Sequence, residues 1–354
     1  MANRNVGLFV LVLAGLAATM GCGGGASKQP PPASQTEFLY SIATSGTPPN
    51  LSFELLSFTL DPSTGTVSAP LSLVLSQPSD GLAVRPDAKF LYVSNSAPGL
   101  AAIDIYSIDS KTGGLITAGV FPVTTICPFC QIQSDPGVLA MNSSGTSLYY
   151  ASATLGGGIA EGIGALTTDA SSGALSLVPG SPFPDNQAPF FVRAHPSGQF
   201  LYTEDINAAD PKGFTLVSVS GYSIDSSTGA LAPVAGSPFP PTANAEAIDF
   251  AIHPSGKFLY ANTGSAANGI LAWNVDATTG ALTPMTGTPF LPGVATYGAT
   301  FDQAGKFLYV SAVVSGGILA FSVDANAGAL TPLSGSPFFA PSFLAPLVID
   351  STGQ

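Results

Sequence analysis

Apolar and polar residues alternate in short runs along most of the chain. The segment 103–109, Ile-Asp-Ile-Tyr-Ser-Ile-Asp, is typical. Alternation over four to eight residues predicts a β-strand with one buried face. Between the runs stand turn-forming residues, among 40 Gly and 31 Pro, and only 8% of all residues are charged. This mix suits short strands joined by turns and not long surface helices, so the sequence predicts an all-β fold.

The strand pattern recurs with a period of about 50 to 58 residues. Each unit holds an aromatic strand, an alternating strand that ends in Asp, and a Gly-x-Leu strand after a Thr-Gly or Ser-Gly turn. Each aromatic strand after the first is preceded by an apolar strand and a tight turn. The aromatic strand reads Phe-Leu-Tyr or Ser-Leu-Tyr at 38–40, 90–92, 147–149, 200–202, 258–260 and 307–309. Each unit is therefore predicted to be a four-stranded antiparallel sheet.

Four short strands cannot bury both faces alone, so units of this size pack face to face around an axis as the blades of a β-propeller. Six units are counted, and a seven-bladed ring is the alternative. The first unit lacks its apolar strand, and an apolar strand at 344–350 ends the chain. We expect this last strand to join the first blade and close the ring, which would remove exposed sheet edges. The propeller is assigned to residues 37–354.

The N-terminus predicts export. Arg4 precedes an apolar stretch of about 15 residues, shorter than the roughly 20 that a membrane span needs. Gly21 before Cys22 resembles the lipobox of bacterial lipoproteins, although Thr19 departs from the usual Leu. This resemblance implies a signal peptide at 1–21, lipidation of Cys22, and a spacer at 22–36 with a stiff proline run. A plain signal peptide or an uncleaved anchor is the alternative. The expected location is the bacterial cell envelope, on the periplasmic or outer-membrane face.

Charge excludes one class of partner. The formal net charge is -12, and removal of residues 1–21 takes away Arg4 and no acid, which leaves -13. The nine Lys and Arg are scattered singly and form no basic patch. Such a surface repels nucleic acid. Nucleotide binding is not expected either, because the glycines at 156–164 lie between predicted strands, whereas a nucleotide loop joins a strand to a helix.

Several motifs resemble the lactonase-type β-propeller family, named after 6-phosphogluconolactonase, and especially its secreted bacterial lipoprotein branch. They are Gly-Ser-Pro-Phe at 180–183, 236–239 and 335–338, Gly-Thr-Pro-Phe at 287–290, His-Pro-Ser-Gly-Lys-Phe-Leu-Tyr at 253–260 and Asp-Ala-Thr-Thr-Gly-Ala-Leu-Thr-Pro at 276–284. The resemblance covers about 37–354 and implies a propeller, usually of seven blades. It is specific for the fold and weak for activity, because these motifs form turns and blade packing.

A lactonase needs a group that activates water and a group that steadies the oxyanion. Both histidines, His195 and His253, occupy a turn position that Arg, Asn or Asp fills in other units, so we interpret them as turn residues. Arg193 lies two residues before His195 and is expected on the same face, toward the axial channel. The acidic candidates near that channel are Glu246, Asp249, Asp80 and Asp135. The competing interpretation is that these are solvated charges and that Arg193 pairs with one of them.

The expected ligand is neutral. A sugar phosphate needs convergent Lys or Arg, whereas Lys89, Lys257 and Lys306 share one turn position spread around the ring. No cofactor is expected. Glu204, Asp205 and Asp210 could form a calcium loop, but they lack the spacing of a recognised one, so we favour a solvated acidic loop and no metal.

Two further features of the sequence have structural interpretations. Cys127 and Cys130 are interpreted as a local disulfide, with free thiols or a shared metal site as alternatives. The single Trp273 is interpreted as core packing, because it replaces the Tyr or Phe of its repeat position.

The sequence favours an exported, lipid-anchored propeller that acts as a binding or scaffold module for a carbohydrate, lactone or protein. The first alternative is a lactone hydrolase that uses the axial channel. The second is a cell-surface adhesion protein, suggested by the Leu-Tyr-Val-x-Asn motif at 91–95. Convergent polar side chains in the channel would favour the enzyme.

Overall fold

The chain is described from a computed structural model. The described residues are 12–14, 37–47, 50–60, 71–77, 79–95, 102–123, 139–152, 162–185, 188–207, 215–241, 245–264, 269–291, 293–301, 304–312, 318–334 and 336.

Within these residues the fold is built from repeated four-stranded antiparallel units, as the sequence predicts. From unit 2 on, the first strands are β5 (Ser79–Val84), β9 (Leu139–Met141), β14 (Ala188–Ala194), β18 (Ala245–Ile252) and β22 (Thr296–Phe301). The second, aromatic strands of units 1 to 6 are β2 (Glu37–Thr47), β6 (Phe90–Asn95), β10 (Ser147–Ser152), β15 (Phe200–Ile206), β19 (Phe258–Thr263) and β23 (Phe307–Ala312). The third strands are β3 (Asn50–Leu60), β7 (Ala102–Ile108), β11 (Gly162–Thr168), β16 (Thr215–Ile224), β20 (Ile270–Val275) and β24 (Ile318–Val323). The fourth strands are β4 (Leu71–Leu75), β8 (Leu115–Pro122), β12 (Leu175–Leu177), β17 (Leu231–Pro233), β21 (Leu282–Pro284) and β25 (Leu330–Pro332).

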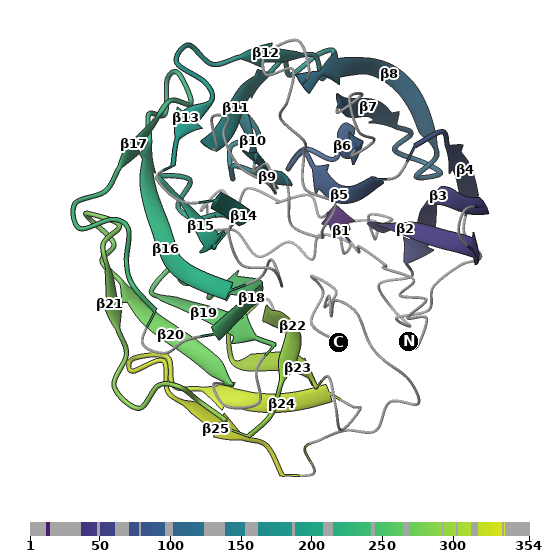
Figure 1. Cartoon of the computed structure of the whole chain (residues 1–354). Coiled ribbons are helices and arrows are strands. Elements are labelled where there is room, and N and C mark those ends of the chain that lie inside the picture. The colour runs from purple at the N-terminus through teal and green to yellow at the C-terminus, as the bar shows by residue number, and fades with distance from the viewer. Residues whose placement is uncertain are drawn as a thin grey trace, which may run out of the picture.

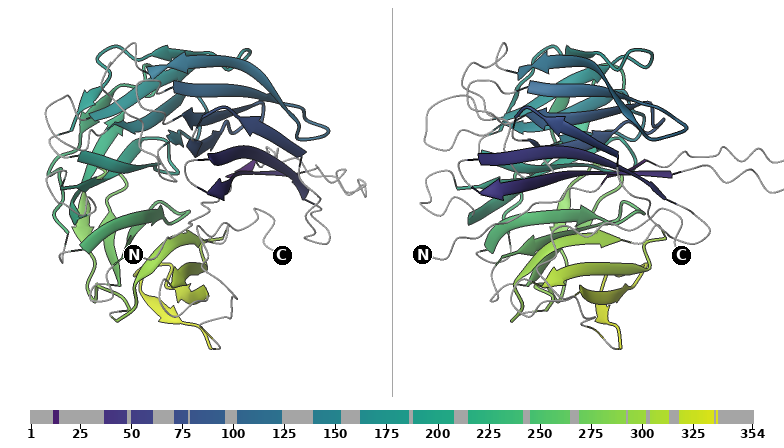
Figure 2. Two further views of the ribbon diagram at one scale, coloured as in Figure 1. Left: turned by 45° about the vertical axis from the view of Figure 1, so that its right-hand side comes forward. Right: turned by 90° about the vertical axis from the view of Figure 1, so that its right-hand side faces the viewer.

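The units follow one another around an axis in chain order, with the first strands innermost and the fourth strands at the rim (Figure 1). Units 4 and 5 form one eight-stranded sheet, because β16 pairs with β18 over two residues, and the short β13 (Phe183–Pro184) pairs with β11 in unit 3. Seen from the side, the strands of all units lie within one thick layer (Figure 2). The described residues therefore hold six four-stranded units of a propeller, and closure of the ring is not seen among them.

The inner edge of unit 1 differs from expectation. We predicted that the C-terminal strand at 344–350 would pair there, but the strand on that edge is β1 (Val12–Ala14), in register with Phe38–Tyr40 of β2. β1 comes from the apolar segment that the sequence assigns to a signal peptide, and residues 344–354 lie outside the described part of the chain. An apolar segment with strand-forming residues satisfies the same free edge that the C-terminal strand was expected to cover.

A tyrosine of the second strand ties each of units 1 to 5 to the unit that follows it. The phenolic oxygen donates a hydrogen bond of 2.7–3.3 Å to the carbonyl of the glycine in the turn between the third and fourth strands of the following unit. The pairs are Tyr40 with Gly113, Tyr92 with Gly173, Tyr149 with Gly229, Tyr202 with Gly280, and Tyr260 with Gly328. The recurring aromatic motif is thus an inter-unit staple.

In units 2 to 6, the Asp that follows the third strand builds the turn that carries this glycine. In Asp225, for example, one carboxylate oxygen accepts hydrogen bonds from the backbone N–H groups of Ser227 and Thr228, and these bonds and the hydroxyl of Ser227 lower the pKa of Asp225 to about 2. The turn glycines have φ between 67° and 77°, a region that L-residues rarely adopt. The same turn therefore requires both the Asp and the Gly that recur in each repeat.

The Gly-Ser-Pro-Phe and Gly-Thr-Pro-Phe motifs follow the fourth strand and contact the third strand of the same unit. The Ser or Thr hydroxyl accepts a backbone N–H of that strand at 2.9–3.0 Å. The acceptors are Ser181, Ser237, Thr288 and Ser336. These motifs are structural.

Apolar clusters fill the spaces between neighbouring units. The cluster between units 4 and 5 contains the fully buried Trp273, which confirms its interpretation as a core residue. No helix in the described part of the chain is long and apolar enough to cross a membrane.

Candidate functional site

A hollow of about 320 Å³ lies where the first strands of units 4, 5 and 6 meet. Its described lining residues come from β14, β18, β22 and the turns that follow β14 and β18: Arg193, Ala194, Pro196, Phe250, Ala251, Ile252, Pro254, Ala299 and Phe301. Three successive residues of β18 line it, although their side chains alternate between the two faces of the sheet. The hollow therefore runs along the inner edge of the sheets, which is the side of the propeller axis (Figure 1).

Arg193 is the charged residue of this lining. Its guanidinium lies 5.7 Å from the ring centre of Phe250, and one nitrogen donates to the carbonyl of Val192 at 3.0 Å. Its side chain is 29% exposed. Arg193 thus lines the hollow from the first strand of unit 4, and its orientation toward the axial channel stays a prediction.

Arg193 forms an ion pair across the boundary between units 4 and 5. Its Nη2 donates to Oδ1 of Asp249 at 2.6 Å, and the backbone N–H of Phe250 donates to the same oxygen at 2.8 Å. Burial raises the pKa of Asp249, and the charge of Arg193 and the two hydrogen bonds oppose that rise. Asp249 is thus a largely buried carboxylate beside a cation, and the pairing that we held as the competing interpretation is present.

A second carboxyl, Glu204, lies behind this pair. Glu204 pairs with Phe191 across β14 and β15, and Tyr202 pairs with Arg193, so Glu204 and Arg193 lie diagonally on one face of the sheet, toward unit 5. Glu204 is 0% exposed, and neither of its carboxyl oxygens has a hydrogen-bond partner. Burial and the charge of Asp249 raise the pKa of Glu204 well above its usual range, against an opposing effect of Arg193. Burial therefore favours the neutral, protonated form of Glu204.

The expected acidic loop at Glu204 and Asp205 is wrong. Both residues lie within β15, and adjacent strand residues point to opposite faces of a sheet, so their carboxyl groups cannot converge on one ion. Asp205 instead accepts hydrogen bonds from the hydroxyls of Thr203, Ser218 and Ser220 at 2.6–2.8 Å. No cluster of three or more His, Cys, Asp or Glu suited to a metal occurs among the described residues, and Asp210 lies outside them.

Both histidines serve turns, as interpreted from the sequence. Nδ1 of His195 accepts the backbone N–H of Ser197, and Nε2 lies 2.7 Å from the carbonyl of Gly256 in the next unit. Burial lowers the pKa of His195. His253 has the same contacts with Ser255 and Gly305, and both rings are buried. Because both ring nitrogens are engaged in the fold, neither histidine is a candidate base.

Glu246 and Asp80 are not among the described residues that line the hollow. Glu246 lies at the start of β18, in the stretch that pairs with Thr215 of β16, three residues before Asp249. Asp80 lies in β5 of unit 2, far along the ring from unit 4, and its side chain is outside the description. Asp135, Cys22, Cys127 and Cys130 also lie outside the described residues.

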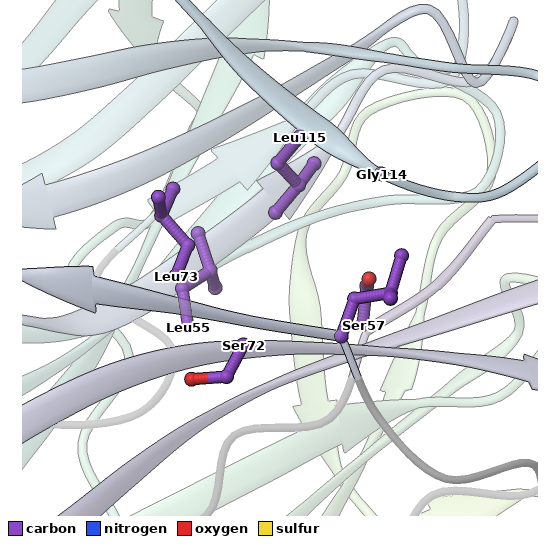
Figure 3. Close-up of a pocket in the computed structure, with 7 residues that line it drawn as sticks. Leu55, Ser57, Ser72, Leu73, Gly114 and Leu115 are labelled. Atoms are coloured by element: carbon purple, nitrogen blue, oxygen red, sulfur yellow. The ribbon is translucent and has the colours of Figure 1, made fainter.

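A second hollow, of about 190 Å³, lies between the outer strands of units 1 and 2 (Figure 3). Its described lining consists of leucines with Ser57, Ser72 and Gly114 and contains no titratable side chain. It therefore offers no acid or base for a reaction. The first hollow is the better candidate, because Arg193 lines it and forms an ion pair with the adjacent Asp249 carboxylate.

Sequence reasoning identified Arg193 and Asp249 and missed the role of Glu204. The sequence did contain an indication of this role. Residues two apart in a strand share a face, so Glu204 lies on the same face as the staple residue Tyr202 and in the same space between units. Chemically, Asp249 offers a base and Arg193 a cation that stabilises negative charge, and Glu204 adds a buried carboxyl whose neutral form is favoured.

Comparison with known proteins relates the chain to lactonase-like propellers. Residues 217–342 match the family described as a lactonase with a 7-bladed β-propeller. No curated protein sequence matches the chain significantly.

Three solved structures are similar in fold. A protein from Lactobacillus plantarum superposes with a TM-score of 0.61 at 18% identity, over 85% of this chain and 82% of that one. The periplasmic gluconolactonase of Pseudomonas aeruginosa gives 0.58 at 19% identity, over 83% and 81%. A functionally unknown protein from Desulfotomaculum acetoxidans gives 0.54 at 14% identity, over 87% and 86%.

Proposed function

We propose that this propeller is a lactonase-like protein that hydrolyses a small neutral lactone in the hollow beside Arg193 and Asp249. The observation that carries the proposal is the ion pair between these two residues, which joins a cation and a buried carboxylate of neighbouring units at 2.6 Å. Arg193 lines an otherwise apolar hollow and the Asp249 carboxylate lies directly beside it, and a few polar groups at an apolar hollow are typical of a small-molecule site.

The proposed reaction uses one water. The carbonyl oxygen of the lactone lies toward the Arg193 guanidinium, and the Asp249 carboxylate takes a proton from the water as its oxygen attacks the carbonyl carbon. The negative charge that develops on the carbonyl oxygen is stabilised by Arg193. The ring C–O bond then breaks, and the leaving alkoxide takes the proton from Asp249, which gives the open hydroxy acid. A pKa of Asp249 raised by burial makes its carboxylate a stronger base.

The test is hydrolysis of neutral and phosphorylated lactones by residues 22–354, measured against the spontaneous rate in the same buffer. Asp249→Asn should lower kcat by roughly 100-fold or more, as expected for loss of a general base, and Arg193→Ala by a similar factor. Lys257→Ala, at an exposed turn, is the matched control and should behave as the parent. The absence of any acceleration over buffer would contradict the proposal.

A binding module without catalysis is the second candidate. The observation in its favour is that Arg193 and Asp249 already engage each other, so a ligand could rest on the apolar wall without displacing them. Saturable binding of a lactone with no hydrolysis would select this candidate.

We also propose that the chain is exported and held in the cell envelope by a lipid on Cys22, with Cys127 and Cys130 as a local disulfide. Support for this comes from the sequence: the apolar stretch before Gly21-Cys22 and the proline-containing spacer behind it. Incorporation of a labelled fatty acid into the chain, and its loss in Cys22→Ser, would test the anchor. Thiol titration before and after reduction would test the disulfide.

A further inference from the structure

We infer that the substrate of this hollow is an apolar lactone, one that carries an alkyl or aryl substituent, and not a polyhydroxylated sugar lactone. The inference rests on the proposed function, because it assigns the ligand class of the same site. It is argued from the chemistry of the wall and from its shape.

The wall offers little to hydroxyl groups. Its described side chains are those of Phe250, Ile252, Phe301, three alanines and two prolines, with Arg193 as the polar exception. None of them carries a hydroxyl, amide or carboxylate group. A sugar lactone would leave several hydroxyls without hydrogen-bond partners once it entered, and buried polar groups without partners are strongly disfavoured. An alkyl chain, by contrast, gains from leaving water for such a wall.

The single charge lies at one side of the hollow. The Arg193 guanidinium, which comes from β14, lies over the ring of Phe250 and pairs with Asp249. Both of these partners belong to β18. The opposite wall, from β22, presents Ala299 and Phe301. A lactone that directs its carbonyl to Arg193 therefore directs its substituent toward β22.

The size and the charge of the site agree with this class. About 320 Å³ is at the lower end of the range for small-molecule sites, enough for one lactone ring with a short chain. The partnered carboxylate of Asp249 and the buried Glu204 lie behind the cation, so the site offers no surplus positive charge for a phosphate or a second carboxylate.

The experiment compares three six-membered lactones with residues 22–354: δ-valerolactone, δ-decalactone and D-glucono-δ-lactone. Hydrolysis is followed against each spontaneous rate, and binding is measured separately by calorimetry. We expect kcat/KM for δ-decalactone to exceed that for δ-valerolactone by at least tenfold, and D-glucono-δ-lactone to be the poorest of the three.

A matched pair of variants locates the effect. Ala299→Phe narrows the hollow at β22 and should lower kcat/KM for δ-decalactone at least tenfold more than for δ-valerolactone. Ala232→Phe, at an exposed position of β17, should retain the parent's preference. The comparison of the three lactones on the parent chain needs no variant, so it stands even if Ala299→Phe fails to fold.

The outcomes separate the two proposals. A preference for D-glucono-δ-lactone would overturn the apolar class and leave the hydrolase intact. Saturable binding of δ-decalactone that Ala299→Phe weakens, with no hydrolysis of any lactone, would support the class and overturn the hydrolase. Neither binding nor hydrolysis of any of the three would overturn both.

Discussion

At the scale of single residues, the unusual group is the carboxyl of Glu204. It lies in the apolar space between units 4 and 5 with no hydrogen-bond partner, and ionisation there would place a bare negative charge in a medium of low dielectric constant. Burial therefore raises the pKa of Glu204 in the folded chain above the value of about 4.3 that a glutamate has in an unfolded chain. This difference in proton binding links stability to pH.

The first prediction concerns that linkage. Below about pH 4 Glu204 is protonated in both states and contributes no pH dependence. As the pH rises through the unfolded pKa toward the raised folded pKa, the unfolded chain binds fewer protons, so the free energy of unfolding falls by about 1.4 kcal/mol per pH unit. Glu204→Gln, which is always neutral, should match the parent near pH 4 and unfold at a higher temperature at pH 7.

Thermal unfolding of parent and variant across this pH range is the measurement. Glu54→Gln, in the partly exposed strand β3, is the control for loss of a carboxyl outside the inter-unit space. Equal melting temperatures of Glu204→Gln and the parent at every pH would show that Glu204 is not held protonated.

The sequence predicts this residue only in part. Alternation from the Phe-Leu-Tyr motif places Glu204 on the same face as Tyr202, but the neighbouring Asp205 and Asn207 suggest a polar loop instead. What decides is the length of β15, which runs to Ile206, and strand length depends on pairing with β14 and β16 and not on local composition. The pairing of Arg193 with Asp249 likewise depends on which units are adjacent.

At the scale of elements, the staple from a second strand to the turn of the next unit is the recurring contact. It recurs because the turn needs a glycine at positive φ, and the Phe and Tyr of the preceding unit pack against that glycine and bond to its carbonyl. Phe200 and Tyr202, for instance, both meet Gly280. The aromatic and glycine motifs are thus two halves of one contact.

Removal of one staple hydroxyl should cost stability without changing the packing. Tyr260→Phe leaves the buried carbonyl of Gly328 without its 2.7 Å hydrogen bond, and we expect a loss of about 1–2 kcal/mol in the free energy of unfolding. Tyr106→Phe is the matched control, because Tyr106 is a buried tyrosine of a third strand and takes no part in the staple. Denaturant titration measures both, and equal losses would contradict the staple.

The glycine half of the contact can be tested in the same way. A Cβ at Gly280, where φ is 72°, would lie 2.5 Å from the Phe200 ring, whereas a Cβ at Gly287, where φ is 87°, meets nothing within 4 Å. Both changes to Ala strain the backbone, and Gly280→Ala also clashes. We expect it to destabilise by about 1–3 kcal/mol more than Gly287→Ala. Equal losses for the two variants in denaturant titration would mean that the Phe200 ring moves aside at no cost in stability.

Elements of this kind are what the sequence predicts best. The Asp-to-Gly turn and the Phe-Leu-Tyr strand depend on neighbours within a few residues, and six copies reinforce the pattern. The edge of β2 is different, because any strand of suitable composition can pair there, and the structure has β1 where we expected the C-terminal strand. Local patterns identify a strand, and they leave its partner open when two candidates compete.

At the scale of the whole molecule, export would change this edge. Cleavage before Cys22 would remove β1 and leave the edge of β2 free. Our prediction that residues 344–350 take that edge then has a direct test in the chain that begins at Cys22. Deletion of residues 344–354 should lower its melting temperature by several degrees, whereas deletion of residues 351–354 alone should not. Equal melting temperatures for the two deletions would exclude this closure.

The staple also affects how the number of units in such a ring can change during evolution. Each unit that the structure describes around a staple supplies a tyrosine donor for the next unit or a glycine acceptor for the previous one, and the central units supply both. A tandem duplication of one repeat, 50 to 58 residues of coding sequence, would bring its own donor and acceptor and require no compensating change elsewhere. Rings of six and seven units are therefore a single genetic step apart, and the size of the central opening can evolve while the staple between units is kept.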